Sequence, residues 1–269
     1  MKKTALFLLV FIGMTACKTN PFTGKSTLNF YGDNSSLFPT AFAEYDKFLK
    51  SNEVVNGTAE AAMITRAGQR IARAAERWLT ANGYPGYLKD YRWEYNLVKD
   101  KAVNAWCMPG GKIVFYTGIL PICQDETGVA VVMGHEVAHA LADHGAQRMS
   151  AQTLQALGMA AGNVAIQDPE DRMLFNAAYG VGTQVGGMLP FSRSHEAEAD
   201  RIGLQIMAIA GYDPAEAPEL WKRMKANGKG APPEILSTHP SDDSRIANLT
   251  QWVPGAVAEA RKFGVTAFE

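Results

Sequence analysis

Apolar residues recur at intervals of three and four along most of the chain, and this spacing predicts a mainly helical fold. The clearest run covers Thr58 to Asn82 and stops at Gly83, so we expect one long helix packed on the core. Its apolar face is formed by Met63, Ala67, Ile71, Ala74 and Trp78.

A different, alternating pattern follows this helix and predicts strands. Residues Tyr91–Val98 alternate, Lys101–Trp106 form a second short extended run, and Gly110-Gly111 lead into Lys112–Tyr116. These runs predict a small β-sheet just ahead of the next helix. The expected fold class is therefore α+β, mainly helical.

Residues 149–189 are rich in Ala, Gly and Met but contain polar interruptions. Neither half offers the roughly twenty apolar residues that a membrane-spanning helix needs. We expect a helical hairpin that turns at Asp168-Pro169. Three interpretations stay open for it: a mobile cover over a cleft, a surface that meets membrane proteins, or a plain part of the core.

The N-terminus resembles a bacterial lipoprotein signal. Lys2 and Lys3 precede a short apolar run that ends at Thr15-Ala16-Cys17, which is typical of secretory signals and too short for a comfortable membrane span. The resemblance implies a lipidated Cys17 at the outer membrane, with the folded domain in the periplasm. The alternative is an ordinary signal peptide cleaved nearby.

Composition and charge narrow the function classes. The hydrophobic content of 47% is ordinary for a globular chain, and the formal net charge is −1 with no basic block, which argues against nucleic acid as a partner. Beyond the signal, Cys107 and Cys123 are the only thiols. An even pair in an oxidising compartment predicts a disulfide, and two reduced buried thiols are the alternative.

The strongest chemical signal is His135-Glu136-Val137-Ala138-His139. Side chains four apart on a helix share one face, so both imidazoles can bind one metal ion, while Glu136 can take a proton from the attacking water. We place this pentapeptide in a helix over 124–144, begun by Asp125 or Thr127 and ended by Gly145.

A hydrolytic zinc site needs three protein ligands and one open position. A second helix, predicted over Phe191–Met207 from an apolar stripe that includes Ile202, carries Glu196 and Asp200 on one side. This pair suits a carboxylate ligand followed by a carboxylate that orients a ligand imidazole.

With these residues in view, the chain resembles metallopeptidase family forty-eight, which includes the CAAX prenyl proteases, HtpX-like membrane proteases and periplasmic lipoproteins. Four segments resemble the family, namely Asn104–Ile113, Gly134–His139, Ser192–Asp200 and Thr238–Ile246, in an order that extends over most of residues 55–253.

The resemblance implies a zincin-like metalloprotease domain with one Zn²⁺ per chain, bound by His135, His139 and Glu196. It also implies that Glu136 is the general base, that Asp200 orients a ligand, and that the Asn104-Ala105 strand contacts the substrate. The alternative for Asn104 and Ala105 is an ordinary strand and turn.

Four further side chains lie near these motifs in the sequence. We expect His144 to be exposed near the helix end and His195 to point away from the metal. His239 precedes a helix that we expect to start at Pro240. It either donates to the oxyanion, or occupies the open zinc position and inhibits the enzyme, or lies at this helix entry without a role in the active site. Arg245 could instead supply the positive charge that stabilises the oxyanion. The alternative is that Arg245 is a solvated arginine on the surface.

We therefore expect a signal peptide in 1–16, a lipid-anchored lead and first helix in 17–52, a metalloprotease domain in 53–253 and a C-terminal tail in 254–269. Within the lead, residues 19–37 are expected to be irregular. The expected function is a zinc endopeptidase of the cell envelope that cleaves unfolded or misassembled proteins. The alternative is a zinc-containing assembly factor or chaperone that works with the outer-membrane assembly machinery. A purely structural zinc module would have no use for Glu136.

Overall fold

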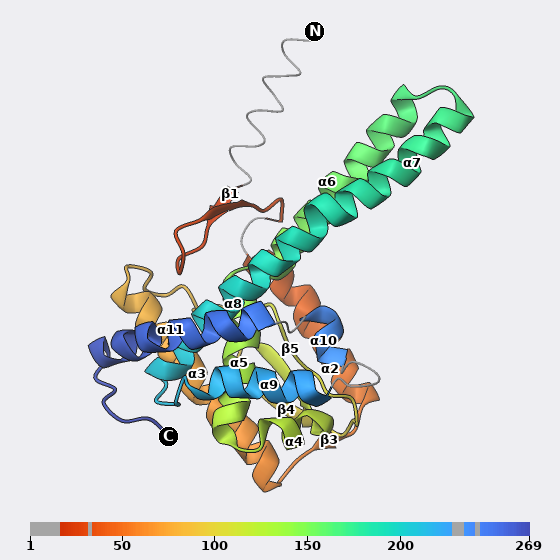
Figure 1. The fold of residues 1–269 in the computed structure, drawn as a ribbon. Coiled ribbons are helices and arrows are strands. Elements are labelled where there is room, and N and C mark those ends of the chain that lie inside the picture. Colours follow the sequence, from red (N-terminus) through yellow and green to blue (C-terminus); the bar gives the residue numbers. More distant parts are fainter. Residues whose placement is uncertain (1–16, 32–33, 228–233, 240–242) are drawn as a thin grey trace.

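The computed structural model describes residues 17–31, 34–227, 234–239 and 243–269, so the predicted signal in 1–16 lies outside the described residues. The fold is mainly helical, as predicted, and contains two small sheets where one was predicted (Figure 1). In chain order the elements are β1 (Cys17–Thr19), β2 (Ser26–Leu28), η1 (Asn34–Leu37), α2 (Phe38–Ser51), β3 (Val54–Val55), α3 (Ala59–Ala81), β4 (Glu94–Val98), β5 (Ala105–Met108), β6 (Lys112–Tyr116), η2 (Thr117–Ile119), α4 (Leu120–Cys123), α5 (Glu126–Leu141), α6 (His144–Ala165), α7 (Pro169–Thr183), the π-helical turn η3 (Gln184–Met188), α8 (Leu189–Ile209), α9 (Glu216–Asn227), α10 (Glu234–Thr238) and α11 (Asp243–Lys262).

Helix α5 lies at the centre of the core. Every residue from Gly128 to Leu141 is buried, and α3, α4, α8 and α9 pack around it. The long helix predicted from periodicity is α3, whose first turn is capped by the Thr58 hydroxyl accepting from the Ala61 amide at 3.1 Å. The two histidines of α5 therefore sit in the most enclosed part of the molecule.

Helices α5 and α8 approach closely because glycines face each other at the crossing. A Cβ atom added at Gly134 would lie 2.9 Å from the Gly203 carbonyl oxygen, and one added at Gly203 would lie 2.8 Å from the His135 amide nitrogen. Neither position has room for a side chain. This contact brings the backbone beside His135 within reach of side chains on α8.

The larger sheet has the strand order β3-β4-β6-β5, with β4 and β6 parallel and the other pairs antiparallel. The predicted strand over Lys112–Tyr116 is confirmed, but the strand expected over Lys101–Trp106 is wrong because β5 begins only at Ala105. The Asp100 carboxylate accepts the Ala102 amide at 2.8 Å and holds the preceding residues in a turn. Strand β5 is left at the sheet's edge.

The predicted disulfide is absent, since neither Cys107 nor Cys123 is bonded to another cysteine. Cys107 pairs with Ile113 at the start of β6, close to the tight turn that joins β5 and β6. Cys123 ends α4, which follows the other end of β6. The two thiols thus lie beyond opposite ends of one strand.

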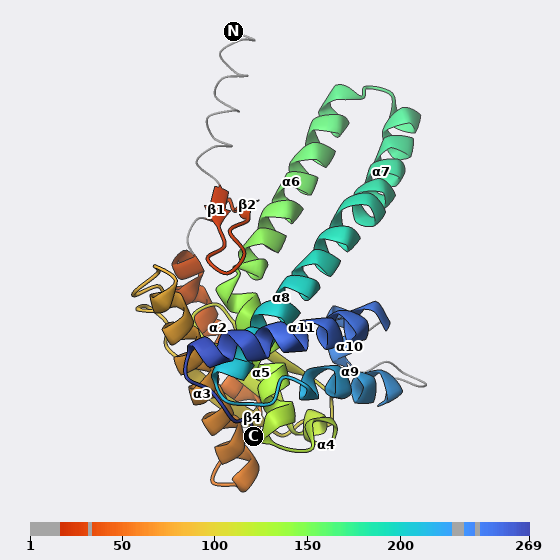
Figure 2. The same ribbon diagram turned by 60° about the vertical axis from the view of Figure 1, so that its left-hand side comes forward.

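Helices α6 and α7 form the predicted hairpin and turn at Asp168, whose carboxylate caps α7. The hairpin projects away from the rest of the molecule, and α7 continues through η3 into α8 (Figures 1 and 2). No residue of α7 is buried, and Leu157 and Val164 are 60% and 77% exposed, so the core interpretation is wrong. In the described part of the chain, no helix is both long and apolar enough to cross a bilayer.

Both ends of the described chain are more ordered than predicted. Residues 19–37 were expected to be irregular, but β1 and β2 form an antiparallel hairpin there. Helix α11 crosses residue 253 and continues to Lys262, so residues 254–262 are not a separate tail. The Glu269 amide then donates to the Gly211 carbonyl at 3.0 Å, which docks the C-terminus on the end of α8.

Candidate metal centre

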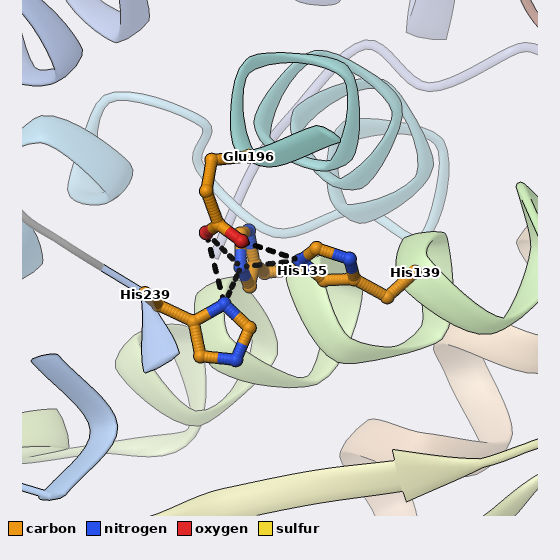
Figure 3. A group of neighbouring side chains, drawn as sticks. All are labelled: His135, His139, Glu196 and His239. Carbon is orange, nitrogen blue, oxygen red and sulfur yellow. Dashed lines mark hydrogen bonds and ion pairs between the residues drawn. The ribbon is translucent and has the colours of Figure 1, made fainter. Parts of the chain in front are cut away.

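Four side chains from three parts of the chain converge on one point, as Figure 3 shows. His135 and His139 lie one turn apart on α5, Glu196 comes from α8, and His239 follows α10. One donor atom from each residue lies within 4.8 Å of all the others. The structure therefore brings the three predicted ligands together and adds His239 to them.

The spacing of the donor atoms fits a zinc ion. The Nε2 atoms of His135 and His139 are 3.1 Å apart, and Glu196 places its carboxylate oxygens 3.3 and 3.4 Å from them. A tetrahedral zinc ion with bonds of about 2.0–2.1 Å separates its ligand atoms by about 3.3 Å. Three imidazoles and one carboxylate are also a donor set that zinc prefers.

The fourth donor, His239, fits the same geometry. Its Nδ1 atom lies 2.9 Å from Glu196 Oε2 and 3.2 Å from His135 Nε2. His239 therefore points into the ligand set and is not an uninvolved residue at a helix entry. Pro240, the predicted start of the next helix, lies outside the described residues, and α11 begins at Asp243.

Asp200 lies behind the ligands, where it holds His135. Its Oδ1 atom is 2.9 Å from the His135 Nδ1 atom, on the opposite side of the ring from the donor nitrogen. Arg245 donates to both oxygens of this carboxylate, at 2.7 and 2.6 Å. Asp200 thus has the position expected of a carboxylate that orients a ligand imidazole.

Arg245 is 6% exposed, so the expectation of a solvated surface arginine is wrong. Its guanidinium stacks on the Trp221 ring at 3.4 Å and also donates to the His239 carbonyl at 3.4 Å. The bidentate pair with Asp200 directs the guanidinium to the back of the ligand set. This position favours a role in holding Asp200 over a role at the oxyanion.

The buried charges shift the protonation of the ligands. Burial and the Arg245 charge oppose a proton on His135, but hydrogen bonds to Asp200 and Glu196 outweigh them and raise the pKa of His135 to about 9. Burial lowers the pKa of His139. Burial also opposes ionisation of Glu196, yet the surrounding imidazoles outweigh it and hold the pKa of Glu196 far below its usual range.

Glu136 faces a pocket of about 340 Å³ that borders the candidate metal site. The pocket is also lined by Asn104 and Ala105 at the start of the edge strand, and by His139 and His239. The Oε1 atom of Glu136 is buried, has no hydrogen-bond partner among the residues that the structure describes, and lies 3.6 Å from His239 Nε2. A buried carboxylate oxygen of this kind can bind a water molecule held beside the metal.

His144 is fully buried, so the prediction that it is exposed is wrong. Helix α5 ends at Leu141, three residues before the predicted region ends, because Asp143 adopts a left-handed conformation with φ of 58°. The chain then turns and places His144 Nδ1 2.8 Å from His139 Nδ1. His139 and His144 are five residues apart, so a continuous helix would place them on different faces. The contact could be predicted only with knowledge of the helix break.

His195 contacts no ligand in the set, as predicted. Its Nε2 atom donates to Gln147 Oε1 at 3.0 Å, and its ring stacks on that of His144 with centroids 4.0 Å apart. Glu198, which the sequence interpretation missed, lies 3.4 Å from His144 Nε2. A buried network therefore lies next to the ligand His139.

Comparisons with known proteins agree with this site. A sequence profile of peptidase family M48 matches residues 64–253. The chain is similar to the mitochondrial metalloendopeptidase OMA1 of Schizosaccharomyces pombe, with 35% identity over 69% of this chain and 53% of that protein. OMA1 of Arabidopsis thaliana is 36% identical over 68% of this chain and 36% of its own length.

A bacterial relative is similar as well. The beta-barrel assembly-enhancing protease of Escherichia coli K12 is 33% identical over 56% of this chain and 32% of its own length. The chain thus spans about half or less of the length of the curated relatives that it matches. The matched region includes all four converging side chains.

Proposed function

The chain belongs to peptidase family M48, and from this premise we propose that it is a zinc-dependent endopeptidase that cleaves unfolded or misassembled polypeptides. One observation carries the proposal. Two of the four converging donors, His139 and His239, line the same pocket as the carboxylate of Glu136 and the edge strand β5. Metal, base and a binding edge for an extended chain are thus adjacent.

In the proposed reaction, His135, His139 and Glu196 hold the metal, and Asp200 keeps the His135 ring in one orientation. A bound zinc ion supplies Lewis acidity, which acidifies water and polarises the peptide carbonyl. Glu136 accepts the proton of the attacking water and returns it to the leaving amine. No serine or cysteine nucleophile takes part.

The substrate class follows from the edge of β5. The Asn104 carbonyl accepts the Tyr116 amide at 3.1 Å, so in the antiparallel ladder the backbone groups of Ala105 and Cys107 point to the open edge. The Ala105 amide is bound by the Asn104 side chain at 2.9 Å, which leaves the Ala105 carbonyl and the Cys107 backbone for pairing. An extended polypeptide can add a strand there, whereas a folded one cannot.

His239 sets the resting state in this proposal. A zinc ion with four protein donors has no open position, and hydrolytic sites keep one. The arrangement with His239 Nδ1 beside Glu196 supports the inhibitory alternative over the oxyanion alternative. A substrate that enters the pocket then displaces His239, whose side chain lines that pocket.

We further propose a lipid anchor at Cys17 and a location at the bacterial outer membrane, facing the periplasm. The support is the pattern Lys2-Lys3, apolar run, Thr15-Ala16-Cys17, together with the exposure of Cys17 at the start of β1. Because the names of several relatives place them in mitochondria, the compartment of this protein needs a direct test. Mass spectrometry of the mature N-terminus of the protein from a bacterial host is expected to find diacylglyceryl on Cys17, and an unmodified Cys17 would contradict the anchor.

A second function has support in one relative's name, the beta-barrel assembly-enhancing protease. This candidate is a zinc-containing assembly factor with low or latent protease activity that works with the outer-membrane assembly machinery. The two candidates differ in whether assembly needs Glu136. If Glu136→Gln supports outer-membrane protein assembly as well as the wild type does, the assembly role is independent of proteolysis.

Cleavage of an unfolded protein tests the main proposal. Purified protein is incubated with reduced, alkylated casein, after chelation and after readdition of zinc, beside Glu136→Gln. We expect cleavage that stops on chelation, returns with zinc and is absent in Glu136→Gln. Equal cleavage by Glu136→Gln and wild type would show that Glu136 is not the base.

A further inference from the structure

We propose that His144 and Glu198 position the metal ligand His139, and that the segment directly after Cys17 holds Glu198 in place. The inference rests on the proposed metal site. It concerns a chain of hydrogen bonds that begins on the far side of His139 from the metal and ends in the β1–β2 hairpin.

The two nitrogens of His139 face different groups. Nε2 points to the ligand set, 3.1 Å from His135 Nε2, whereas Nδ1 lies 2.8 Å from His144 Nδ1. A neutral imidazole that gives its Nε2 lone pair to a metal carries its proton on Nδ1. His139 must therefore donate at Nδ1, and His144 must accept.

This assignment fixes the next bond in the chain. If His144 accepts at Nδ1, its own proton is on Nε2, which lies 3.4 Å from Glu198 Oε2. A carboxylate accepts there without competition, because an ionised carboxylate has no proton to donate. The three side chains thus allow one consistent pattern, in which every proton points from the metal ligand toward Glu198.

The N-terminal hairpin holds the carboxylate at the end of this chain. The Oε1 atom of Glu198 accepts from the Asn20 side-chain amide at 2.7 Å and from the Thr23 hydroxyl at 2.9 Å. Lys18 pairs with Asp143 at the break between α5 and α6, which ties the same hairpin to the turn that aims His144. Two separate contacts therefore join residues 18–23 to this network.

Burial shields the centre of this network from solvent, whereas Glu198 and Thr23, at its end, also line a pocket of about 400 Å³. His144 is fully buried, its ring stacks on His195, and Asn20 is 6% exposed. His195 donates from Nε2 to Gln147 Oε1 at 3.0 Å, and its ring packs against that of His144. Loss of the acceptor on His144 leaves the His139 N–H buried and unpaired.

The affinity of the protein for zinc is the quantity to measure. Mutation of a residue that is hydrogen-bonded to a ligand imidazole typically lowers metal affinity by about 10–100-fold. Zinc affinity is measured by competition with a chromophoric chelator, and the Co²⁺ absorption spectrum reports ligand geometry. His144→Phe keeps the ring stack but removes the acceptor, and Glu198→Ala removes the end of the chain. We expect both to weaken zinc binding by about 10–100-fold and to alter the Co²⁺ spectrum.

Two pairs of variants separate positioning from folding. His144→Gln offers a carbonyl to His139 and an amide to Glu198, so it is expected to recover most of the affinity. Thr23→Val removes a bond to Glu198. Thr19→Val makes the same change at a hydroxyl that, in the described part of the chain, bonds to Ser26 at 2.9 Å and lies outside the network. We expect several-fold weaker zinc binding for Thr23→Val and no change for Thr19→Val.

Unaltered zinc affinity and Co²⁺ spectra in Glu198→Ala and Thr23→Val would overturn the inference, even if His144→Phe fails to fold. If the wild type binds zinc and cleaves casein, and Glu198→Ala and Thr23→Val bind zinc equally well, the inference is wrong but the proposed function stands. If the wild type binds zinc and loses it in the variants as expected but cleaves nothing, the proposed function fails and the inference stands.

Discussion

The Nδ1 atom of His239 lies 2.9 Å from the Oε2 atom of Glu196, and this contact closes the candidate metal site with a fourth side-chain donor. Helices α5 and α8 supply the other three donors from a tightly packed core, whereas His239 follows the short helix α10. The donor most easily withdrawn is therefore the one that occupies the position a hydrolytic zinc site keeps open.

Removal of this donor is expected to activate the enzyme. In His239→Ala the metal keeps three protein ligands, so we expect casein cleavage to rise severalfold while zinc content stays near one per chain. Initial rates at saturating zinc measure this. A lower rate with unchanged zinc content would instead assign His239 to stabilisation of the oxyanion.

The pair Asp200–Arg245 is expected to set metal affinity through His135. Asp200→Asn and Arg245→Leu both release the His135 ring, and we expect zinc affinity to fall by about 10–100-fold. Arg245→Lys should not restore it, because a lysine cannot bind both carboxylate oxygens and stack on Trp221. Chelator competition is the measurement, and full affinity in Arg245→Lys would contradict the bidentate role.

The glycine contact between α5 and α8 is expected to matter for stability. Ala in place of Gly in a helix usually stabilises by roughly 0.5–1 kcal/mol. In Gly203→Ala the new Cβ meets the backbone of Gly134 and His135, so we expect destabilisation by about 1–3 kcal/mol in urea unfolding.

The matched control for this prediction is Gly255→Ala, which also lies in a helix but has nothing within 4 Å of the added Cβ. It should be neutral or slightly stabilising. Equal unfolding free energies for the two variants would mean that α5 and α8 do not meet as described.

Metal loading is expected to depend on pH through His135. The pKa of His135 is raised to about 9, so at neutral pH the metal-free protein carries a proton there that zinc must displace. Zinc affinity should therefore increase with pH up to about 9 and then level off. The same proton stabilises the metal-free fold below pH 6.5, and this contribution is lost as pH rises through 9.

Calorimetry in two buffers of different ionisation enthalpy counts the protons released on zinc binding. We expect about one proton at pH 7.5 from His135 and fewer above pH 9. No proton release at pH 7.5 would contradict the assignment.

Local patterns, together with the family resemblance that they supported, predicted the ligands. His135 and His139 share a helix face at a spacing of four, and Glu196 and Asp200 share a face of α8 at the same spacing. Both facts depend on helical periodicity alone. The sequence therefore located the metal site without knowledge of how the two helices cross.

Features that depend on a single backbone break could not be predicted in this way. The left-handed conformation of Asp143 turns His144 inward, although continuous helical geometry would place it on the exposed side. The separation of Cys107 from Cys123 likewise depends on the register of β5 and β6. Exposure of the hairpin was one of the interpretations left open, because apolar content does not distinguish a core helix from a projecting one.

The metal content of natively purified protein tests the central claim most directly. Elemental analysis is expected to find about one zinc per chain in the wild type and almost none in a variant that carries both His135→Ala and His139→Ala. A wild type without stoichiometric metal, or a double variant that keeps it, would contradict the assignment of these side chains to a single zinc site.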